Sequence, residues 1–287
     1  MPDENQIAAV LVRLKIRVFP NTRQDVAITN EVRAKKSLGR GAGKWVKHLF
    51  PEEALKGIKE AGGEARRRHY DLTLPWEDGC RLLPTKAHPT HREDMAVLQN
   101  NFEARVNLFG REYAKWVALA EVMHGKTFDA SLYPEWEIMR NNFSFEVAHE
   151  PVPAAAHFLT SDMATQAVEE MRQQLEASNR SRVEMAIRDV WNRVMTPVQA
   201  LSEKLSNPEA VFRNSLIANV TEILDLVPQL NVTNNADLLQ AANVIRERFA
   251  NLDPELLRTD VNLRRDVAEA AKALVANFGV IGKRRFA

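Results

Sequence analysis

The sequence contains a single cysteine, Cys80, among its 287 residues. One thiol cannot form an intramolecular disulfide, and such sparse use of cysteine is typical of proteins from a reducing compartment. Long apolar runs are also missing: no stretch approaches the roughly 18 apolar residues of a membrane-spanning helix. The acidic N-terminus, residues 1–5, lacks the apolar core of a signal peptide. We therefore expect a cytoplasmic protein that does not interact with a membrane.

Net charge is nearly absent as well, since the formal value is +1. The overall balance therefore gives no indication of nucleic-acid or membrane binding. The distribution is uneven, because residues 1–92 hold 18 Lys and Arg against 11 Asp and Glu, while the remainder holds 21 against 27. The chain thus has a basic front and an acidic back, an asymmetry that the overall balance does not reveal.

Motifs of the common enzyme classes are missing. The sequence has no Gly-x-Ser-x-Gly elbow, no His-Glu-x-x-His helix and no dinucleotide-binding glycine pattern. The glycine cluster at residues 39–44 is not a phosphate loop, since three residues separate Gly39 from Gly43 and Trp45 stands where Ser or Thr is needed. It is better interpreted as a flexible basic loop. We expect a non-enzymatic protein without a cofactor.

Four potential metal ligands occur near one another in the sequence, namely Cys80, His88, His91 and Asp94. Structural zinc sites usually use pairs of Cys or His ligands at close spacing on both sides of the site. Only His88 and His91 are closely spaced here, so these histidines are interpreted as loop residues. The sequence predicts no metal site.

Three segments have the pattern of β-strands. Residues 12–18 alternate apolar and basic side chains, which is typical of a strand with one buried face. Residues 70–76 and 80–84 flank the turn signal Glu77-Asp78-Gly79 and predict a hairpin. Residues 142–150 form a further candidate strand. Together these segments predict one small antiparallel sheet.

Helical periodicity dominates the rest of the chain. Apolar residues recur every three or four positions from Met95 to Met123, and again from about residue 161 to 205. We expect two long helices, at about 89–124 and 161–205, packed together as an antiparallel, coiled-coil-like hairpin. Shorter helices follow, at about 208–228, 235–250, 254–259 and 262–278. The fold class is therefore mainly α with a small antiparallel β element, in which the hairpin is joined to a C-terminal helical bundle.

This organisation divides the chain into two parts. Residues 1–158 form a basic α+β part that contains the first long helix, and residues 159–287 form an all-helical part. Within the first part we expect a short helix from Pro51, interrupted at Gly62-Gly63, and a kink at Pro197 in the second.

The segment from Arg33 to Arg68 contains eleven Lys and Arg residues, with aromatic side chains within or next to it. Basic side chains release counterions from phosphates, and aromatic rings stack on unpaired bases. The segment therefore predicts nucleic-acid binding, with single-stranded DNA favoured. The alternative is a solvated surface that pairs with the acidic half of the chain. The candidate binding residues are Lys35, Lys36, Arg40, Lys44, Trp45, Lys47, Arg66, Arg67, Arg68 and Tyr70.

A second functional hypothesis follows from the long apolar stripes. Helices of this length commonly expose part of their apolar face to another copy of the same chain. The sequence therefore also predicts a homo-oligomeric structural or adaptor protein. The two hypotheses are compatible, because oligomerisation multiplies weak phosphate contacts.

Several stretches resemble a family of bacteriophage-encoded proteins of unknown function. The resemblance is carried by residues 69–76, by 102–106 with Tyr113, by 143–147 with 151–153, and by 212–216 with 225–228. Genes of that family often neighbour a MoxR-type AAA+ ATPase. The resemblance thus implies a phage accessory protein in the host cytoplasm with a possible ATPase partner, and it implies no catalytic residue.

Overall fold

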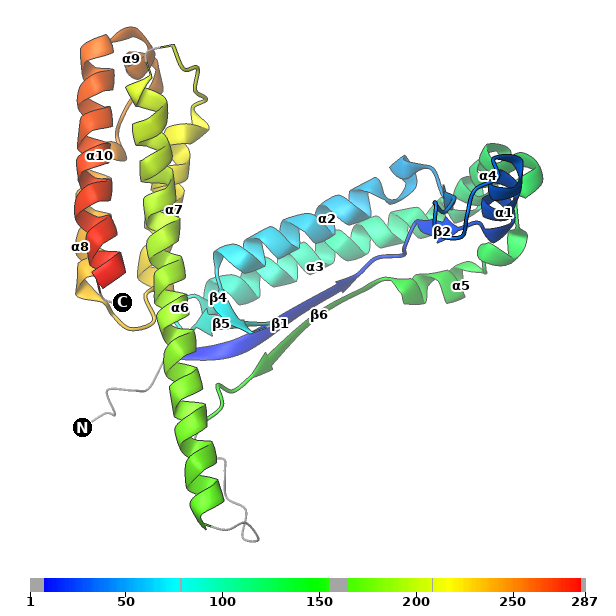
Figure 1. Ribbon diagram of the computed structural model, residues 1–287, viewed down its shortest axis with the longest axis horizontal. Coiled ribbons are helices and arrows are strands. Elements are labelled where there is room, and N and C mark those ends of the chain that lie inside the picture. The colour runs from blue at the N-terminus through cyan, green and yellow to red at the C-terminus, as the bar shows by residue number, and fades with distance from the viewer. Residues whose placement is uncertain (1–7, 78, 155–164, 208, 285–287) are drawn as a thin grey trace. The chain divides into compact units, whose positions relative to one another are not determined.

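A computed structural model describes residues 8–77, 79–154, 165–207 and 209–284 (Figure 1). These residues are mainly helical and include a small antiparallel sheet, which confirms the predicted fold class. The chain forms two compact units, each built from separate segments. Unit 1 comprises residues 1–13, 70–91 and 148–287, and unit 2 comprises residues 14–69 and 92–147. The predicted boundary between residues 158 and 159 lies outside the described residues.

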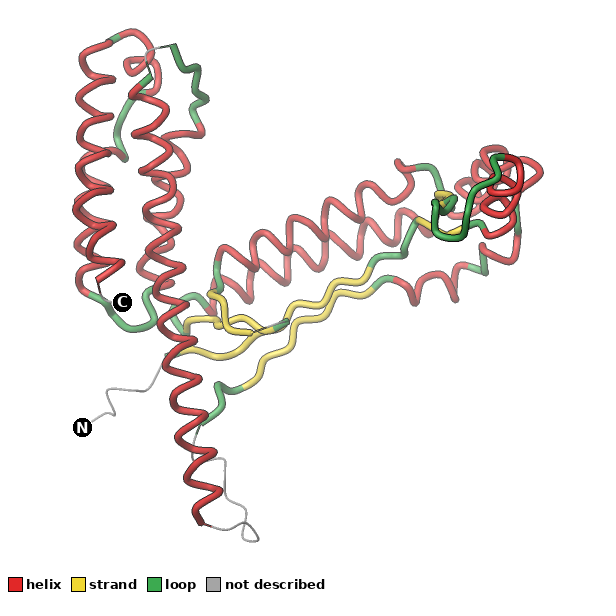
Figure 2. Tube along the Cα trace, in the orientation of Figure 1, coloured by secondary structure: helices red, strands yellow, loops and turns green. Residues whose placement is uncertain are grey.

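The larger sheet contains four strands in the order β4-β5-β1-β6 (Figure 2). β1 runs antiparallel to β5, with Ala9 opposite Pro84, and β4 runs antiparallel to β5. The strands arise where the sequence alternates apolar and polar residues, and Gly79 adopts a positive φ of 76° in the turn between β4 and β5. The predicted strands and hairpin are confirmed at β1 (Ala9–Arg17), β4 (Leu74–Glu77), β5 (Cys80–Pro84) and β6 (Ser144–Glu150).

The helices of unit 1 form the predicted C-terminal bundle. The longest helix, α6, packs against α10 and α7, and α7 packs against α8. The side chain of Asn235 caps α8 at the amide of Leu238, and that of Asp253 caps α9 at the amide of Glu255. The helices are α6 (Thr165–Ser206), α7 (Ser215–Leu230), α8 (Ala236–Phe249), α9 (Pro254–Thr259) and α10 (Val261–Arg284). The predicted helix start at 161 lies outside the described residues. The helix predicted from 208 begins only at Ser215, because residues 209–214 form a turn and an irregular segment.

The predicted pairing of the two long helices is wrong. The apolar stripe of residues 95–123 belongs to α3 (His88–Arg111) and α4 (Tyr113–His124), and its core partners lie on α2 (Glu52–Asp71) and β6. The stripe of α6 belongs to a different core, which it shares with α7, α8 and α10. Periodicity identifies a buried helical face, but an apolar face fits many partners. In unit 2, α2 instead runs antiparallel to α3, since Gly57 lies near Arg105 and Arg68 pairs with Asp94.

Three local expectations also differ from the structure. α2 continues through Gly62-Gly63, because glycine in a helix costs only about 1 kcal/mol relative to alanine and the buried face of α2 offsets that cost. His88 and His91, expected in a loop, lie in the first turn of α3, and His91 is fully buried. α3 ends at Arg111, so the first long helix is two helices that meet at Glu112.

Residues 22–48, which we call the Trp45 module, are more ordered than their composition predicts. β2 (Thr22–Gln24) pairs with β3 (Val46–His48), with Thr22 opposite His48. Between these strands lies α1 (Val26–Lys35), followed by the loop of residues 36–45. In unit 2 the module lies beside the N-terminal end of α2 (Figure 1). Further short elements of this unit are η1 (Gly125–Thr127), η2 (Ala130–Leu132), α5 (Trp136–Met139) and η3 (Arg140–Asn142).

Candidate nucleic-acid interface

The Trp45 module carries seven Lys and Arg residues but only two acidic residues, Asp25 and Glu31. Both carboxylates are engaged with lysines, Asp25 with Lys47 and Glu31 with Lys35. The other five cations form no ion pair with a carboxylate among the described residues; they are Arg23, Arg33, Lys36, Arg40 and Lys44. The module therefore presents a local positive charge that is not paired with carboxylates of the described ranges.

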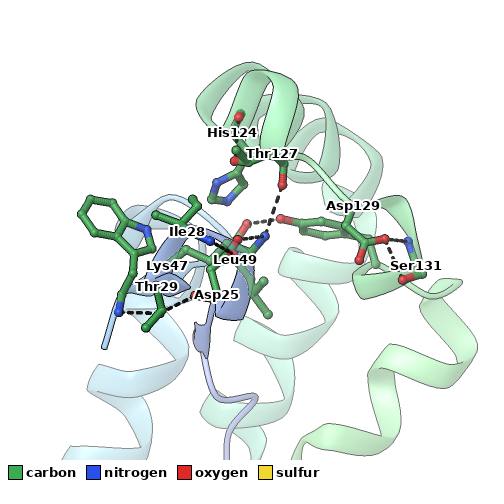
Figure 3. Close-up of polar contacts among 11 residues, drawn as sticks. Asp25, Ile28, Thr29, Lys47, Leu49, His124, Thr127, Asp129 and Ser131 are labelled. Atoms are coloured by element: carbon green, nitrogen blue, oxygen red, sulfur yellow. Dashed lines mark hydrogen bonds and ion pairs between the residues drawn. The ribbon is translucent and has the colours of Figure 1, made fainter. Parts of the chain in front are cut away.

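The base of the module is an ion pair at the start of α1 (Figure 3). Asp25 caps this helix, since its Oδ1 accepts a hydrogen bond from the amide of Ile28 at 3.0 Å. Its Oδ2 lies 3.1 Å from Nζ of Lys47, and both side chains are only about one-tenth exposed. The Ile28 amide, and then Lys47, hold the pKa of the Asp25 carboxyl below its ordinary value. This charge pair fixes α1 to β3.

Thr29 connects α1 to Trp45. Its buried hydroxyl donates to the carbonyl of Asp25 at 2.5 Å and accepts from the amide of Trp45 at 3.0 Å. The Trp45 carbonyl accepts from the amide of Asp25 at 2.9 Å. Both main-chain polar groups of Trp45 are thus bonded to one helical turn. Its backbone is held in place, while the residue as a whole remains 52% exposed.

β3 and the residues that follow it are hydrogen-bonded to the segment that follows α4. Nζ of Lys47 donates to the carbonyl of Thr127 at 3.2 Å, and the Tyr133 hydroxyl donates to the carbonyl of Leu49 at 2.6 Å. Asp129 caps η2 through Ser131 (Figure 3). These bonds join β3 and its continuation to residues more than 75 positions further along the chain. The module is therefore a fixed part of unit 2.

One face of the module is open to solvent, and we call it the solvent face. It carries the exposed side chains of Val32, Leu38 and Trp45, which lie around one pocket. A pocket of about 180 Å³ lies between α1 and the loop, lined by Val32, Leu38 and Trp45 together with Arg33 and Lys44. Nη2 of Arg33 donates to the carbonyl of Gly43 at 2.8 Å, which closes the loop over α1. Proteins that bind single-stranded nucleic acid commonly combine exposed aromatic rings with cations in this way.

Five of the predicted binding residues lie together here. Lys36, Arg40, Lys44 and Trp45 are exposed, and Lys35 is exposed next to Glu31, whose carboxylate raises the pKa of the lysine. Lys47 belongs to the same module but is largely buried by Asp25 and Thr127. The structure therefore places Lys47 in the base of the module and not on its solvent face.

The arginine cluster of α2 lies elsewhere in unit 2. Arg66 is 14 positions from the start of α2, which corresponds to about 21 Å along the helix. Arg66 donates to the carbonyl of Ile16, and Arg68 pairs with Asp94 at 2.6 Å. Arg67 is exposed. The structure thus does not bring this cluster together with the Trp45 module.

Tyr70, the last predicted binding residue, belongs to unit 1. Its ring lies under the guanidinium of Arg81, 4.3 Å from the ring centroid, and its carbonyl accepts from Arg193. Burial, and then the nearby Arg193, lower the pKa of Arg81 to about 10. Tyr70 is thus part of an arginine–aromatic stack within unit 1.

The sequence interpretation missed three residues that shape the module. Asp25 and Thr29 fix Trp45, and Arg33 closes the loop by donating to the carbonyl of Gly43. The sequence interpretation treats Arg33 only as the first residue of the basic segment. The capping position of Asp25 carried a signal, because Asp is a favoured N-cap before an apolar stretch. No feature of the sequence indicates the role of Thr29, because this role depends on a hydrogen bond to a residue 16 positions away.

Comparisons with known proteins identify no relatives. No protein family, curated protein or solved structure is found to match this chain. No helix within the described ranges combines the length and apolarity needed to cross a bilayer. Nor does any group of three or more His, Cys, Asp or Glu residues in the described part of the chain form a candidate metal site.

Proposed function

We propose that this protein is a non-enzymatic nucleic-acid-binding protein that holds single strands on the solvent face of the Trp45 module. The observation that supports this most strongly is the exposed Trp45 on a fixed backbone, beside the cations Arg33 and Lys44, which form no ion pair with a carboxylate in the described part of the chain. The cations supply phosphate affinity, and the ring supplies a stacking surface for unpaired bases. Base-paired DNA keeps its bases inside the helix, so the ring favours single strands.

Binding is tested by fluorescence anisotropy with a labelled single-stranded oligonucleotide and its duplex, at about 50 mM salt. We expect the single strand to bind more tightly than the duplex. The variant Lys36→Glu/Lys44→Glu reverses two cations on the solvent face and should bind more than tenfold more weakly.

A matched control separates this site from the general effect of charge. Lys204→Glu/Lys272→Glu makes the same change in net charge on exposed positions of α6 and α10. This control should bind as the wild type does. Equal weakening of the two variants, or no binding by the wild type at low salt, contradicts the proposal.

A second candidate function, self-assembly as a structural or adaptor protein, is favoured by one observation on α4. Leu119, Val122 and Met123 are exposed by 42%, 82% and 46%, and their spacing places them on one face of the helix. An exposed apolar helical face of this kind fits a second copy of the chain. The phage origin and the ATPase partner stay predictions from the resemblance alone.

Light scattering on the purified protein tests the second candidate. The variant Val122→Asp should convert an oligomer to a monomer, whereas Val97→Asp, at another exposed valine on α3, should leave the oligomer intact. A wild-type monomer at high concentration contradicts self-assembly.

A further inference from the structure

The pocket beside Trp45 has the size of one aromatic ring. Its volume is about 180 Å³. Cavities of roughly 150 Å³ accommodate a benzene-sized ring, whereas drug-sized ligands need about 300 Å³ or more. The pocket therefore fits a single flat heterocycle and not an extended ligand.

The lining of the pocket selects the chemistry of that ring. Val32, Leu38 and the indole of Trp45 provide apolar and aromatic surface, and none of the lining residues is acidic. Lys44 lines the same pocket and forms no ion pair with any residue that the structure describes. Arg33 uses Nη2 for the carbonyl of Gly43, and its Nε has no acceptor among the described residues. Apolar walls with adjacent cations suit a neutral aromatic ring that is linked to a negative charge.

The backbone around the pocket is fixed before any ligand arrives. Both main-chain polar groups of Trp45 are bonded, and the loop is closed by Arg33 at Gly43. Gly41 adopts a positive φ of 99°, a conformation that other residues rarely take. Because the site needs little ordering on binding, the entropic cost of binding is small.

We propose that this pocket takes one unpaired nucleobase of a bound single strand, with the base stacked on Trp45 and its flanking phosphates at Lys44 and Arg33. This inference rests on the proposed function and adds a base-binding subsite to it. A flat anionic lipid surface would also meet cations and an indole. A recessed pocket of one-ring size, however, fits an inserted base better than a planar membrane face.

The test compares two labelled 12-residue strands of equal charge, one with thymine bases and one with abasic sugars throughout. Stacking contributes about 1–3 kcal/mol per base, so the wild type should bind the thymine strand roughly 5- to 150-fold more tightly. Trp45→Ala should bind both strands with the affinity of the abasic strand. Trp45→Phe keeps a ring and should retain part of the preference, which separates stacking from a folding defect.

Each alternative outcome is distinct. Equal binding of both strands by the wild type would overturn the base subsite and leave phosphate binding in place. Absence of binding to either strand would overturn the proposed function and the subsite together. Binding to vesicles that contain phosphatidylserine, without binding to either strand, would assign the surface to anionic lipid and overturn both proposals.

Discussion

Nζ of Lys47 lies 3.1 Å from Oδ2 of Asp25, and this ion pair joins the start of α1 to β3. Lys44, three positions earlier, is exposed and forms no ion pair with a carboxylate of the described residues. Two lysines of one loop and strand thus have different roles. The buried one holds the module together, and the exposed one remains available for a phosphate.

The Asp25 carboxylate predicts a specific dependence of stability on pH. The pKa of this carboxyl in the folded protein is below the ordinary value of 3.8, so the ionised carboxylate contributes fully to folding stability above pH 3.8. That stabilisation is lost as the pH falls through the pKa of the folded state. Asp25→Asn keeps a good helix cap and removes the charge. This variant should melt at a lower temperature than the wild type at pH 7, with a difference that shrinks below pH 3.8.

Thermal unfolding monitored by circular dichroism between pH 2 and 7 measures this difference. Asp266→Asn is the control, because this exposed carboxylate lies 3.8 Å from Arg265 at the surface. It should have little effect at any pH. A difference for Asp25→Asn that stays constant down to pH 2 would contradict the assigned role.

Thr29→Val tests how Trp45 is positioned. The substitution keeps the shape of the side chain but removes the hydroxyl, so the amide of Trp45 loses its acceptor. We expect a loss of about 1–3 kcal/mol in the free energy of unfolding. Single-strand binding should also weaken, although every cation of the module is retained. Urea unfolding and anisotropy measure the two effects.

Thr29→Ser keeps the hydroxyl and should behave nearly as the wild type. The control Thr196→Val removes an exposed hydroxyl that bonds only to the carbonyl of Asn192 in the same helix. It should leave binding unchanged. Wild-type affinity in Thr29→Val would show that the position of Trp45 does not depend on this bond.

Two helical glycines make opposite predictions. Alanine is favoured over glycine within a helix by about 1 kcal/mol. A Cβ at Gly63 of α2 meets nothing within 4 Å, whereas a Cβ at Gly110 of α3 would clash with the ring of Trp136. Gly63→Ala should therefore stabilise the protein by up to about 1 kcal/mol. Gly110→Ala should destabilise it by about 1–3 kcal/mol through overpacking.

Urea unfolding of the two variants decides this prediction, since each serves as the control for the other. Equal effects of both substitutions would contradict the close packing of α3 against Trp136.

Arg264 predicts a large stability effect in unit 1. Its guanidinium is buried and donates to carbonyls at the end of α6 and in the segment after it, including those of Leu205 and Ala210. Arg264→Ala leaves these carbonyls without a donor and should lower the free energy of unfolding by about 2–4 kcal/mol. The neighbouring Arg265 is exposed. Arg265→Ala should change the free energy by less than about 0.5 kcal/mol in the same urea experiment.

Features with local causes were predictable from the sequence. The hairpin of β4 and β5 follows from alternation around Gly79, and the starts of α8 and α9 follow from the capping residues Asn235 and Asp253. Helical periodicity identified α3, α4 and α6 as amphipathic, because the spacing of apolar residues alone determines which face is buried.

Features that depend on distant contacts were not predictable. The sequence does not show that the stripe of α3 meets α2, since any apolar face of similar length would serve. At the candidate site, Lys44 and Lys47 have the same chemistry and similar surroundings in the sequence. Only the folded chain places Asp25 and the carbonyl of Thr127 next to Lys47. Composition therefore located the basic module but did not separate its supporting residues from its exposed ones.

We propose that the exposed cations of the Trp45 module bind the phosphates of a single strand. The most direct measurement is the salt dependence of single-strand affinity by anisotropy between about 50 and 200 mM salt. Each phosphate contact contributes about −0.7 to the slope of log K against log salt. We predict a slope of about −2 to −3.5 for three to five contacts, reduced in magnitude by about 1.4 in Arg40→Gln/Lys44→Gln. The same slope in the variant and the wild type, or a wild-type slope near zero, would contradict the account.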